Sequence, residues 1–433
     1  MSNKLTKISA VIEEISMGPF GSDIKVENFV SQGVPVLNGS NLTSFKLVED
    51  TFKYVTPEKA KTFKKAIARR GDIVITHRGT LGQISYIPKD SLFDEYVISQ
   101  SQFRVSLNKN LVDPSFFVYY FHTSEGQKRL LANKCHVGVP ALAQATTNFR
   151  LIEIPLPSLT TQQKIASVLS ALDAKIELNN RINAELEAMA KTLYDYWFVQ
   201  FDFPNEEGKP YKSSGGTMVW NEELKREIPE GWEVEPLNNN IDLILDHRGK
   251  TPKKLGGDWI YEGDGITAIS AKIVKGGKLV NLEQANKVSF EMYEKWMPEK
   301  LKEGDILMTS EAPLGEFYFL LGKTDYCMSQ RLFAIRANRS KVVPSYLYYE
   351  LSKGNGYSQI IGSQSGSTVF GIRQDELRKI KILKPDIKLQ NKFEDSVIPF
   401  LQRIRNNDSQ NQQLAELRDW LLPMLMNGQV KVQ

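Results

Sequence analysis

The sequence contains an internal duplication, which constrains the fold more than any other feature. Residues 71–76 (Gly-Asp-Ile-Val-Ile-Thr) return as 304–309 (Gly-Asp-Ile-Leu-Met-Thr), and each segment is followed at the same distance by Leu-Gly. Further blocks return in the same order: residues 95–100 at 325–330, 113–116 at 343–346 and 154–157 at 382–385. Chance similarity would not keep these blocks in register, so the chain is predicted to hold two copies of one plan. Each copy is too long for a solenoid repeat, so we expect a domain with an appendage.

Each copy has the pattern of a mixed α+β domain. Short β-branched and aromatic runs at residues 72–76, 84–87 and 317–321 alternate with Gly, Pro and Asn, which predicts strands joined by turns. Residues 113–134 and 343–360 have apolar residues at helical spacing. Strands and helices within one copy favour an α+β fold over an all-β fold.

A long helix is predicted after each domain. Residues 161–198 contain no Gly or Pro, and a heptad pattern starts at Ile165. Position a of the heptad is predicted at Leu172, Asn179, Leu186 and Leu193, and position d, three residues after an a position, at Val168, Ile182, Met189 and Tyr196. The second copy repeats this seam less regularly, with Pro399 in its first turns. Asn179 and Asn407 are the midpoints of the two seams, so an antiparallel pair would place them side by side and fix the register of the helices. An Asn on a partly solvated seam, without pairing, is the alternative.

Five segments follow from the duplication. They are a first domain at 1–158, a long helix at 159–200, a linker at 201–230, a second domain at 231–386 and a second long helix at 387–433. The predicted architecture is two similar α+β domains with two long antiparallel helices that form a coiled coil, related by a pseudo-twofold repeat.

The sequence lacks the residue patterns of common active sites. Gly249-Lys250-Thr251 is the nearest approach to a phosphate-binding loop, but Ile244 stands where the first Gly of that motif belongs. Two cysteines and four histidines show no metal-ligand spacing, so no metal site is expected. No signal peptide and no apolar run long enough for a membrane is present, which favours the cytoplasm. The net charge of +4 is too small to indicate nucleic-acid binding by itself. Only the slight positive excess on the two domains favours it.

The whole layout resembles the specificity subunit of type I restriction-modification systems. The residues that carry the resemblance are Gly18-Pro19-Phe20-Gly21-Ser22, Gly71-Asp72-Ile73, Gly79-Thr80-Leu81-Gly82, Ile154-Pro155-Leu156-Pro157, Thr161-Gln162-Gln163-Lys164-Ile165 and Ile228-Pro229-Glu230-Gly231-Trp232. Each motif is weak alone, but the repeated order is specific and covers nearly the full chain. The loop tips of the second copy differ from those of the first, as two domains reading different bases would require.

The resemblance implies a non-catalytic protein that recognises a bipartite, asymmetric site in double-stranded DNA through two target-recognition domains. It implies two methyltransferase subunits, which use S-adenosylmethionine, and optionally two nuclease subunits, which use ATP and Mg. No cofactor is expected in this chain. Aromatic and apolar residues near the ends of the long helices are candidates for binding these partners: Tyr194, Trp197, Phe201, Trp420 and Leu421.

Polar residues at loop tips are the candidates for DNA contacts. In the first domain they are Ser22, Asn38, Ser40, Asn41, His77, Arg78, Thr80, Gln100 and Gln102. In the second domain they are His247, Arg248, Lys250, Lys253, Lys254, Ser270, Lys272, Ser310 and Arg331. Arg suits guanine and Gln suits adenine, whereas the lysine cluster suits phosphates. Surface salt bridges or strand caps explain each single residue equally well.

Two other functions stay open from the residues alone. One is a coiled-coil adaptor whose domains bind protein partners, which the low total charge favours slightly. The other is an enzyme with an unfamiliar active site, for which His77, His136 and Asp72 are the only candidates. A salt-dependent gel shift separates DNA binding from the adaptor, and an assay of the isolated chain addresses the enzyme.

Overall fold

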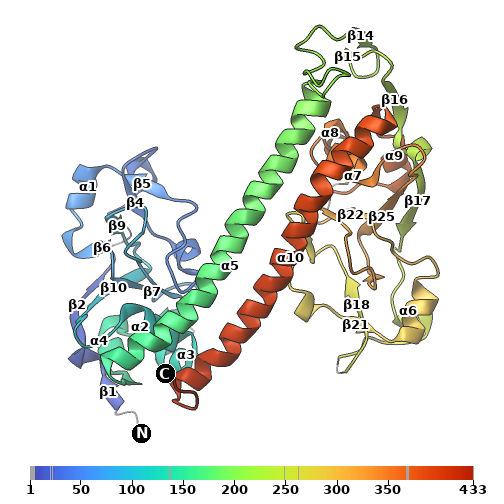
Figure 1. The fold of residues 1–433 in the computed structure, drawn as a ribbon. Helices are drawn as coiled ribbons and strands as arrows, with labels where there is room; N and C mark the ends of the chain where they lie inside the picture. Colours follow the sequence, from blue (N-terminus) through green and yellow to red (C-terminus); the bar gives the residue numbers. More distant parts are fainter. Residues whose placement is uncertain are drawn as a thin grey trace. The chain divides into compact units, whose positions relative to one another are not determined.

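The computed structural model describes residues 5–19, 21, 23–135, 138–247, 249–261, 263–366 and 370–432. The chain forms two compact units, each of which holds one α+β domain with parts of both long helices (Figure 1). Unit 1 comprises Met1–Leu178 and Gln410–Gln433, and unit 2 comprises Asn179–Ser409. No helix in the described part of the chain is long and apolar enough to cross a membrane.

Unit 1 is built on two sheets. The first is antiparallel, in the order β2 (Ile12–Met17), β10 (Gln102–Leu107), β7 (Ile73–Thr76), β8 (Ile84–Tyr86). The second has the order β3 (Phe29–Val30), β5 (Lys53–Val55), β4 (Val34–Val36), β9 (Glu95–Val97), β6 (Ile67–Arg69). The apolar faces of β7 and β10 are fully buried, as the unbroken run Ile73-Val74-Ile75 requires.

Unit 2 repeats this plan, which confirms the predicted duplication and the α+β class. Its main sheet is β17 (Ile241–Asp246), β25 (Leu332–Ala337), β22 (Ile306–Thr309), β23 (Phe317–Phe319), in the same spatial order. The smaller sheet is β21 (Lys287–Val288), β18 (Ile266–Ile269), β24 (Cys327–Met328). Each copy thus has one parallel pair among its strands, β4 with β9 and β18 with β24.

The first and last strands of each domain lie beside each other. In unit 1, β1 (Leu5–Lys7) pairs with β13 (Glu153–Pro155). In unit 2, β16 (Glu233–Pro236) pairs with β26 (Lys381–Lys384). A buried glutamine in the first turn of each long helix then binds the domain: the amide of Gln162 accepts from Asp113 N, and that of Gln390 accepts from Val343 N. Each domain is therefore closed at its base and joined firmly to its helix.

The remaining elements are short. The two segments with helical spacing, residues 113–134 and 343–360, each form two helices. In the first copy these are α2 (Pro114–His122) and α3 (Ser124–Leu130), and in the second copy α7 (Pro344–Ser352) and α8 (Asn355–Gly362). The break after α2 arises because Thr123 is extended and its hydroxyl caps the next helix at Gly126 N. The others are α1 (Pro57–Lys61), α4 (Ala145–Leu151), α6 (Phe290–Trp296), α9 (Gln374–Lys379), β11 (Lys134–Cys135), β12 (Ala141–Leu142), β14 (Met218–Asn221), β15 (Arg226–Pro229), β19 (Val274–Lys275) and β20 (Lys278–Leu279).

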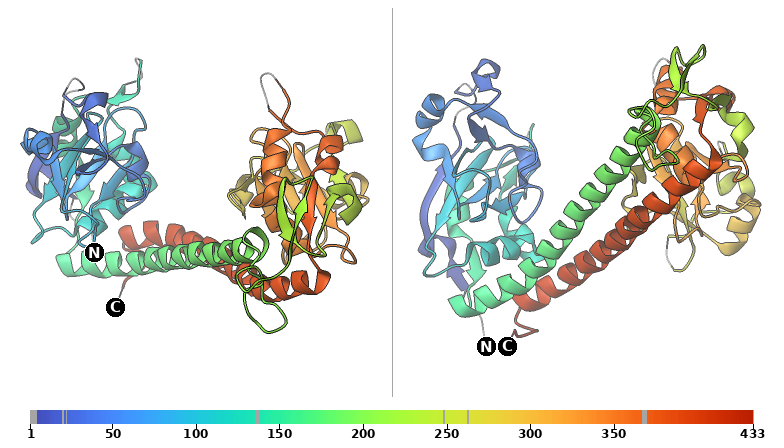
Figure 2. Two further views of the ribbon diagram at one scale, coloured as in Figure 1. Left: turned by 90° about the horizontal axis from the view of Figure 1, so that it is seen from above. Right: turned by 45° about the horizontal axis from the view of Figure 1, so that its top comes forward.

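The two long helices are α5 (Leu159–Tyr194) and α10 (Ile387–Met426), and α10 runs through Pro399 without a break. They lie antiparallel within each unit (Figure 2): Arg418 donates to Asp173 at 2.9 Å in unit 1, and Asn407 Nδ2 donates to Asn183 Oδ1 at 2.8 Å in unit 2. The predicted a positions lie on the seam between the two helices. The second set of seam residues, however, lies four residues after each a position. Met189 and Tyr196, predicted three residues after, are exposed.

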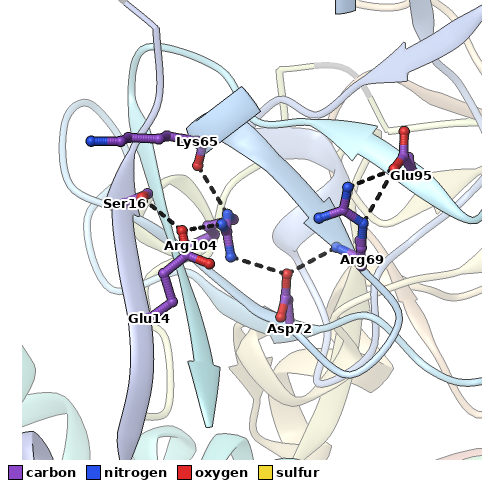
Figure 3. Close-up of polar contacts among 7 residues, drawn as sticks. All are labelled: Glu14, Ser16, Lys65, Arg69, Asp72, Glu95 and Arg104. Carbon is purple, nitrogen blue, oxygen red and sulfur yellow. Dashed lines mark hydrogen bonds and ion pairs between the residues drawn. The ribbon is translucent and has the colours of Figure 1, made fainter. Parts of the chain in front are cut away.

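Both domains bury an equivalent arginine against the Asp of the repeated Gly-Asp motif. In unit 1, Arg104 of β10 lies between Glu14, at 2.6 Å, and Asp72, at 3.5 Å (Figure 3). In unit 2, Arg336 of β25 binds Asp305 with two parallel bonds of 2.8 Å and also pairs with Glu299. Each arginine also donates to the carbonyl of a preceding lysine, Lys65 or Lys300. These clusters hold the middle strands of the main sheets together.

Candidate nucleic-acid interface

The parallel strand pair places the predicted loops at one edge of each domain. Parallel strands run in the same direction, so their carboxyl ends lie at the same edge. In unit 1, β4 leads into Asn38 and β9 into the Ser99-Gln100 turn. In unit 2, β18 leads into Ser270 and β24 into the Ser329-Gln330 turn. The repeated Ser-Gln blocks therefore occupy equivalent places in the two domains.

Backbone and side-chain hydrogen bonds join four predicted loops of unit 1. His77 Nε2 donates to the Gln100 carbonyl at 3.1 Å, and Gly18 N donates to the Gln102 carbonyl at 2.8 Å. A Cβ at Gly18 would lie 1.9 Å from the Ser99 carbonyl oxygen, so no side chain fits there. Gln83 Nε2 donates to the Gly39 carbonyl at 2.9 Å and so connects the fourth loop. The loops at Gly18, 38–41, 77–83 and 99–102 are thus connected to one another.

The predicted residues of unit 1 differ in exposure. Asn38, Ser40, Arg78, Thr80 and Gln100 are exposed, and His77 is half-buried. Burial lowers the pKa of His77, so its ring is neutral near neutral pH.

Asn41 and Gln102 of unit 1 are completely buried. The Asn41 amide binds the carbonyls of Val48 and Thr51, and Gln102 accepts from Ser99 N. For these two the expected direct contact with DNA is replaced by a role in holding the loops. Ser22 lies outside the described residues.

In unit 2 the predicted residues surround a hollow of about 570 Å³. Lys250, Ser270, Lys272 and Arg331 all line it. Arg331 also forms an ion pair with Glu311 at 2.9 Å, with both side chains partly exposed. Such a pair is weak and screened by salt, so Arg331 stays available to another anion.

The other predicted residues of unit 2 lie outside the lining. Lys253 and Lys254 are exposed, whereas His247 and Ser310 are buried. Burial lowers the pKa of His247 to about 4, so it is neutral near neutral pH and supplies no charge for a phosphate. His247 and Ser310 support the loops through their backbone instead of contacting DNA directly: Lys250 N donates to the His247 carbonyl, and Ser310 N donates to the Arg331 carbonyl. Arg248 lies outside the described residues.

Three of the predicted partner-binding residues belong to the core of unit 2. Tyr194 donates to the buried Glu350, Trp197 packs in the same cluster, and Phe201 packs with Trp232. Little of their surface is left for a partner, because the end of α5 packs against the domain of its own unit. Trp420 is 56% exposed and Leu421 is partly exposed, both in unit 1.

The helix-register residues are buried in unit 2. Asn179 is fully buried and Asn407 nearly so. Two hydrogen bonds join the helices there through Asn183, one turn beyond Asn179: Asn407 donates to Asn183, and Asn183 donates to Asp408. Direct pairing of Asn179 with Asn407 stays a prediction, and the sequence pattern did not single out Asn183.

Sequence reasoning also missed residues of the hollow. Trp259 and Trp296 line it and lie against each other, with ring centroids 5.8 Å apart, and Asn281, Gln284 and Asn286 complete one wall. These residues have no counterpart in the repeated blocks of the first copy, so the duplication gave no signal for them. No group of three or more His, Cys, Asp or Glu in the described ranges could hold a metal ion.

Comparison with known proteins gives one consistent result. The family described as "Type I restriction modification DNA specificity domain" matches residues 23–188 and 229–417. The type I restriction enzyme MjaIX specificity subunit of Methanocaldococcus jannaschii is 26% identical, with 94% of this chain and 89% of the relative covered. The HindI specificity subunit of Haemophilus influenzae is 24% identical, with 85% and 88% covered. The fold matches the crystal structure of the type I S subunit from M. genitalium at a TM-score of 0.58 and 15% identity, covering 98% and 95% of the two chains.

Proposed function

Because the chain belongs to the family of type I restriction modification DNA specificity domains, we propose that its two domains read the two parts of a bipartite, asymmetric DNA site. The observation that carries this proposal is the duplicated loop edge with unequal tips. Asn38 of the first copy corresponds to Ser270 of the second, and Ser101 to Arg331, on the same strand framework. Equal frameworks with different tips suit two readers of different base sequences.

The exposed side chains suit two kinds of contact. Arg78 and Gln100 can form paired hydrogen bonds with guanine and adenine edges in the major groove. Lys253 and Lys254 suit phosphates, whose contact positions a protein without specifying sequence. The adaptor function is not favoured, since the family is described by DNA specificity and both relatives are specificity subunits of type I restriction enzymes.

We also infer the partners that such a subunit needs. Two methyltransferase subunits with S-adenosylmethionine would supply methyl transfer, and two nuclease subunits with ATP and Mg are an optional addition. The chain itself is proposed to be non-catalytic, without a cofactor of its own, and to work in the cytoplasm where DNA is accessible. The boundaries 1–158 and 231–386 are retained as the proposed reading domains.

The test is to sequence methylated adenines in the host genome with and without this gene. We expect a split motif of two unequal parts to lose methylation when the gene is absent. Purified chain alone should transfer no methyl groups to DNA of that motif, while the chain with its methyltransferase subunits should do so. Methyl transfer by the chain alone, or a single continuous motif, would contradict the proposal.

Partner binding is testable at Trp420 in unit 1. Trp420 and Leu417 lie one turn apart on α10 and are both exposed, which makes them candidates for an interface anchor. We expect Trp420→Ala to weaken assembly with the methyltransferase subunit by roughly thirtyfold, the effect of an aromatic anchor. Sedimentation or titration calorimetry measures this. Trp220→Ala, at an exposed Trp of β14 in unit 2, is the control; equal weakening by both would exclude a specific role for Trp420.

A further inference from the structure

The shape of the hollow of unit 2 limits which part of a DNA molecule can enter it. The grooves of duplex DNA are read by convex elements, such as a helix or a ribbon, that enter the groove. A base edge inside a stacked duplex cannot reach the floor of a hollow of about 570 Å³. Only the parts that project from DNA can do so: the sugar-phosphate backbone, or a base that has left the stack.

The aromatic floor favours a base. Trp259 is partly exposed and offers a face on which a base can stack. Trp296 lines the same hollow, is completely buried and lies against Trp259, with ring centroids 5.8 Å apart, so it holds the Trp259 ring in place.

The remaining lining favours the phosphate of the same nucleotide. Lys250, Lys272 and Arg331 provide three cations, and none of the described lining residues is Asp or Glu. Amide side chains of Asn281 and Gln284 add donors and acceptors on one wall. Cations at a rim above an aromatic floor match the two ends of a nucleotide.

Backbone conformation gives an independent indication. Asn281, Ala312 and Arg331 all line the hollow, and all have positive φ, of 52°, 49° and 67°. Residues other than glycine adopt this region at an energetic cost, and such residues cluster where a site must be shaped for binding. The surrounding fold therefore holds the wall of the hollow in a strained form.

The first copy has a hollow at the equivalent place with different walls. It measures about 320 Å³ and shares the Ser-Gln turn, as Ser99 and Gln100, but is lined by Ile24 and Phe29 and by no Trp. The Ser-Gln turn therefore belongs to the framework that the two domains share. The wall with Trp259 and Trp296 belongs to the second domain.

We propose that the hollow of unit 2 takes up one nucleotide swung out of the DNA half-site that this domain reads. Its base stacks on Trp259, while Lys250, Lys272 and Arg331 hold its phosphate. This inference rests on the proposed DNA-reading function and makes Trp259 a specificity-determining residue, with Trp296 as the residue that positions its ring.

The experiment uses the full chain with its methyltransferase subunits and a duplex of the methylated motif. The base analogue 2-aminopurine, or pyrrolocytosine at pyrimidines, replaces each base of the second half-site in turn. Its fluorescence is quenched both by stacking between bases and by stacking on an indole ring. At one position other than the methylated base, which the methyltransferase itself extrudes, we expect fluorescence to stay low with the wild type and to rise with Trp259→Leu, because the extruded analogue then lies against a side chain that does not quench it. Trp259→Ala should weaken binding about tenfold.

A second readout tests the same point. A mismatch opposite that position should tighten binding by about tenfold, because less stacking has to be broken. Trp220→Ala is the matched control.

Fluorescence anisotropy of the same duplexes separates the two proposals. Normal binding with no rise in Trp259→Leu at any position other than the methylated base, or a mismatch that weakens binding, would overturn the extruded nucleotide and leave the DNA-reading function intact. Failure to bind the duplex at all would overturn both.

Discussion

Replacing residues 1–158 by the same segment of a relative with another target is expected to change one half of the methylated motif and leave the other half unchanged. The reason is that all the connected loops of unit 1 lie within this segment. Preference for the old half-site over the new should shift by at least about 10³-fold, the usual gap between specific and non-specific binding. Sequencing of methylated adenines in a host that carries the graft measures the outcome.

The matched control is the reciprocal graft of residues 231–386, which should change only the other half. Gln162 and Gln390 must be kept, because their amides join each helix to its domain. A graft that altered both halves of the motif would show that the domains do not read independently.

Replacing the buried Arg336 by Met is expected to cost roughly 3–5 kcal/mol of unfolding free energy, because Asp305 is left buried and unpaired. Arg104→Met should cost less, since its contact with Asp72 is longer, 3.5 Å against 2.8 Å. Urea denaturation with hydrogen exchange assigns each loss to its domain. Arg69→Met is the control: Arg69 pairs with Glu95 at the exposed edge (Figure 3) and should contribute at most about 1 kcal/mol.

The loss in Arg104→Met should depend on pH. Burial raises the pKa of Asp72 even beside Arg104, and the hydrogen bond from Arg104 lowers the pKa of Glu14. Without Arg104 the pKa of Asp72 rises further. The free energy of unfolding of the variant therefore falls as pH increases from the ordinary pKa of an Asp to the raised pKa of Asp72. The wild type, in contrast, loses the contribution of Glu14 as pH decreases. Both effects make the loss of unfolding free energy in Arg104→Met, relative to the wild type, smaller near about pH 4.5 than near about pH 7.5. A larger loss at the lower pH would exclude this account.

The parts of the fold that follow from local pattern were predictable. The duplicated blocks predicted two α+β domains, and the absence of Gly and Pro predicted α5. The seam was less predictable: its second row includes Ala190 and Trp197 rather than Met189 and Tyr196. Positions three and four residues apart both lie near one helix face, and only the partner helix decides between them.

The site was predictable only in part. Loop tips such as Arg78 and Lys272 could be found because polar side chains follow the predicted strands in both copies. Trp259 and Trp296 could not, because strand pairing and helix packing bring them together with Arg331 from distant parts of the sequence. Tyr194 illustrates a different limit, since an aromatic pattern does not tell which apolar surface will cover it.

The strand pairs β1·β13 and β16·β26 fasten the entrance of each domain to its exit. A domain closed in this way can gain or lose residues inside without displacing the chain on either side. This insulation explains how the two copies drifted in length while their blocks kept the same order. The loops of such a closed domain can change while its junction with the long helix stays the same, so substitutions in the loops can alter the DNA site without altering the base of the domain.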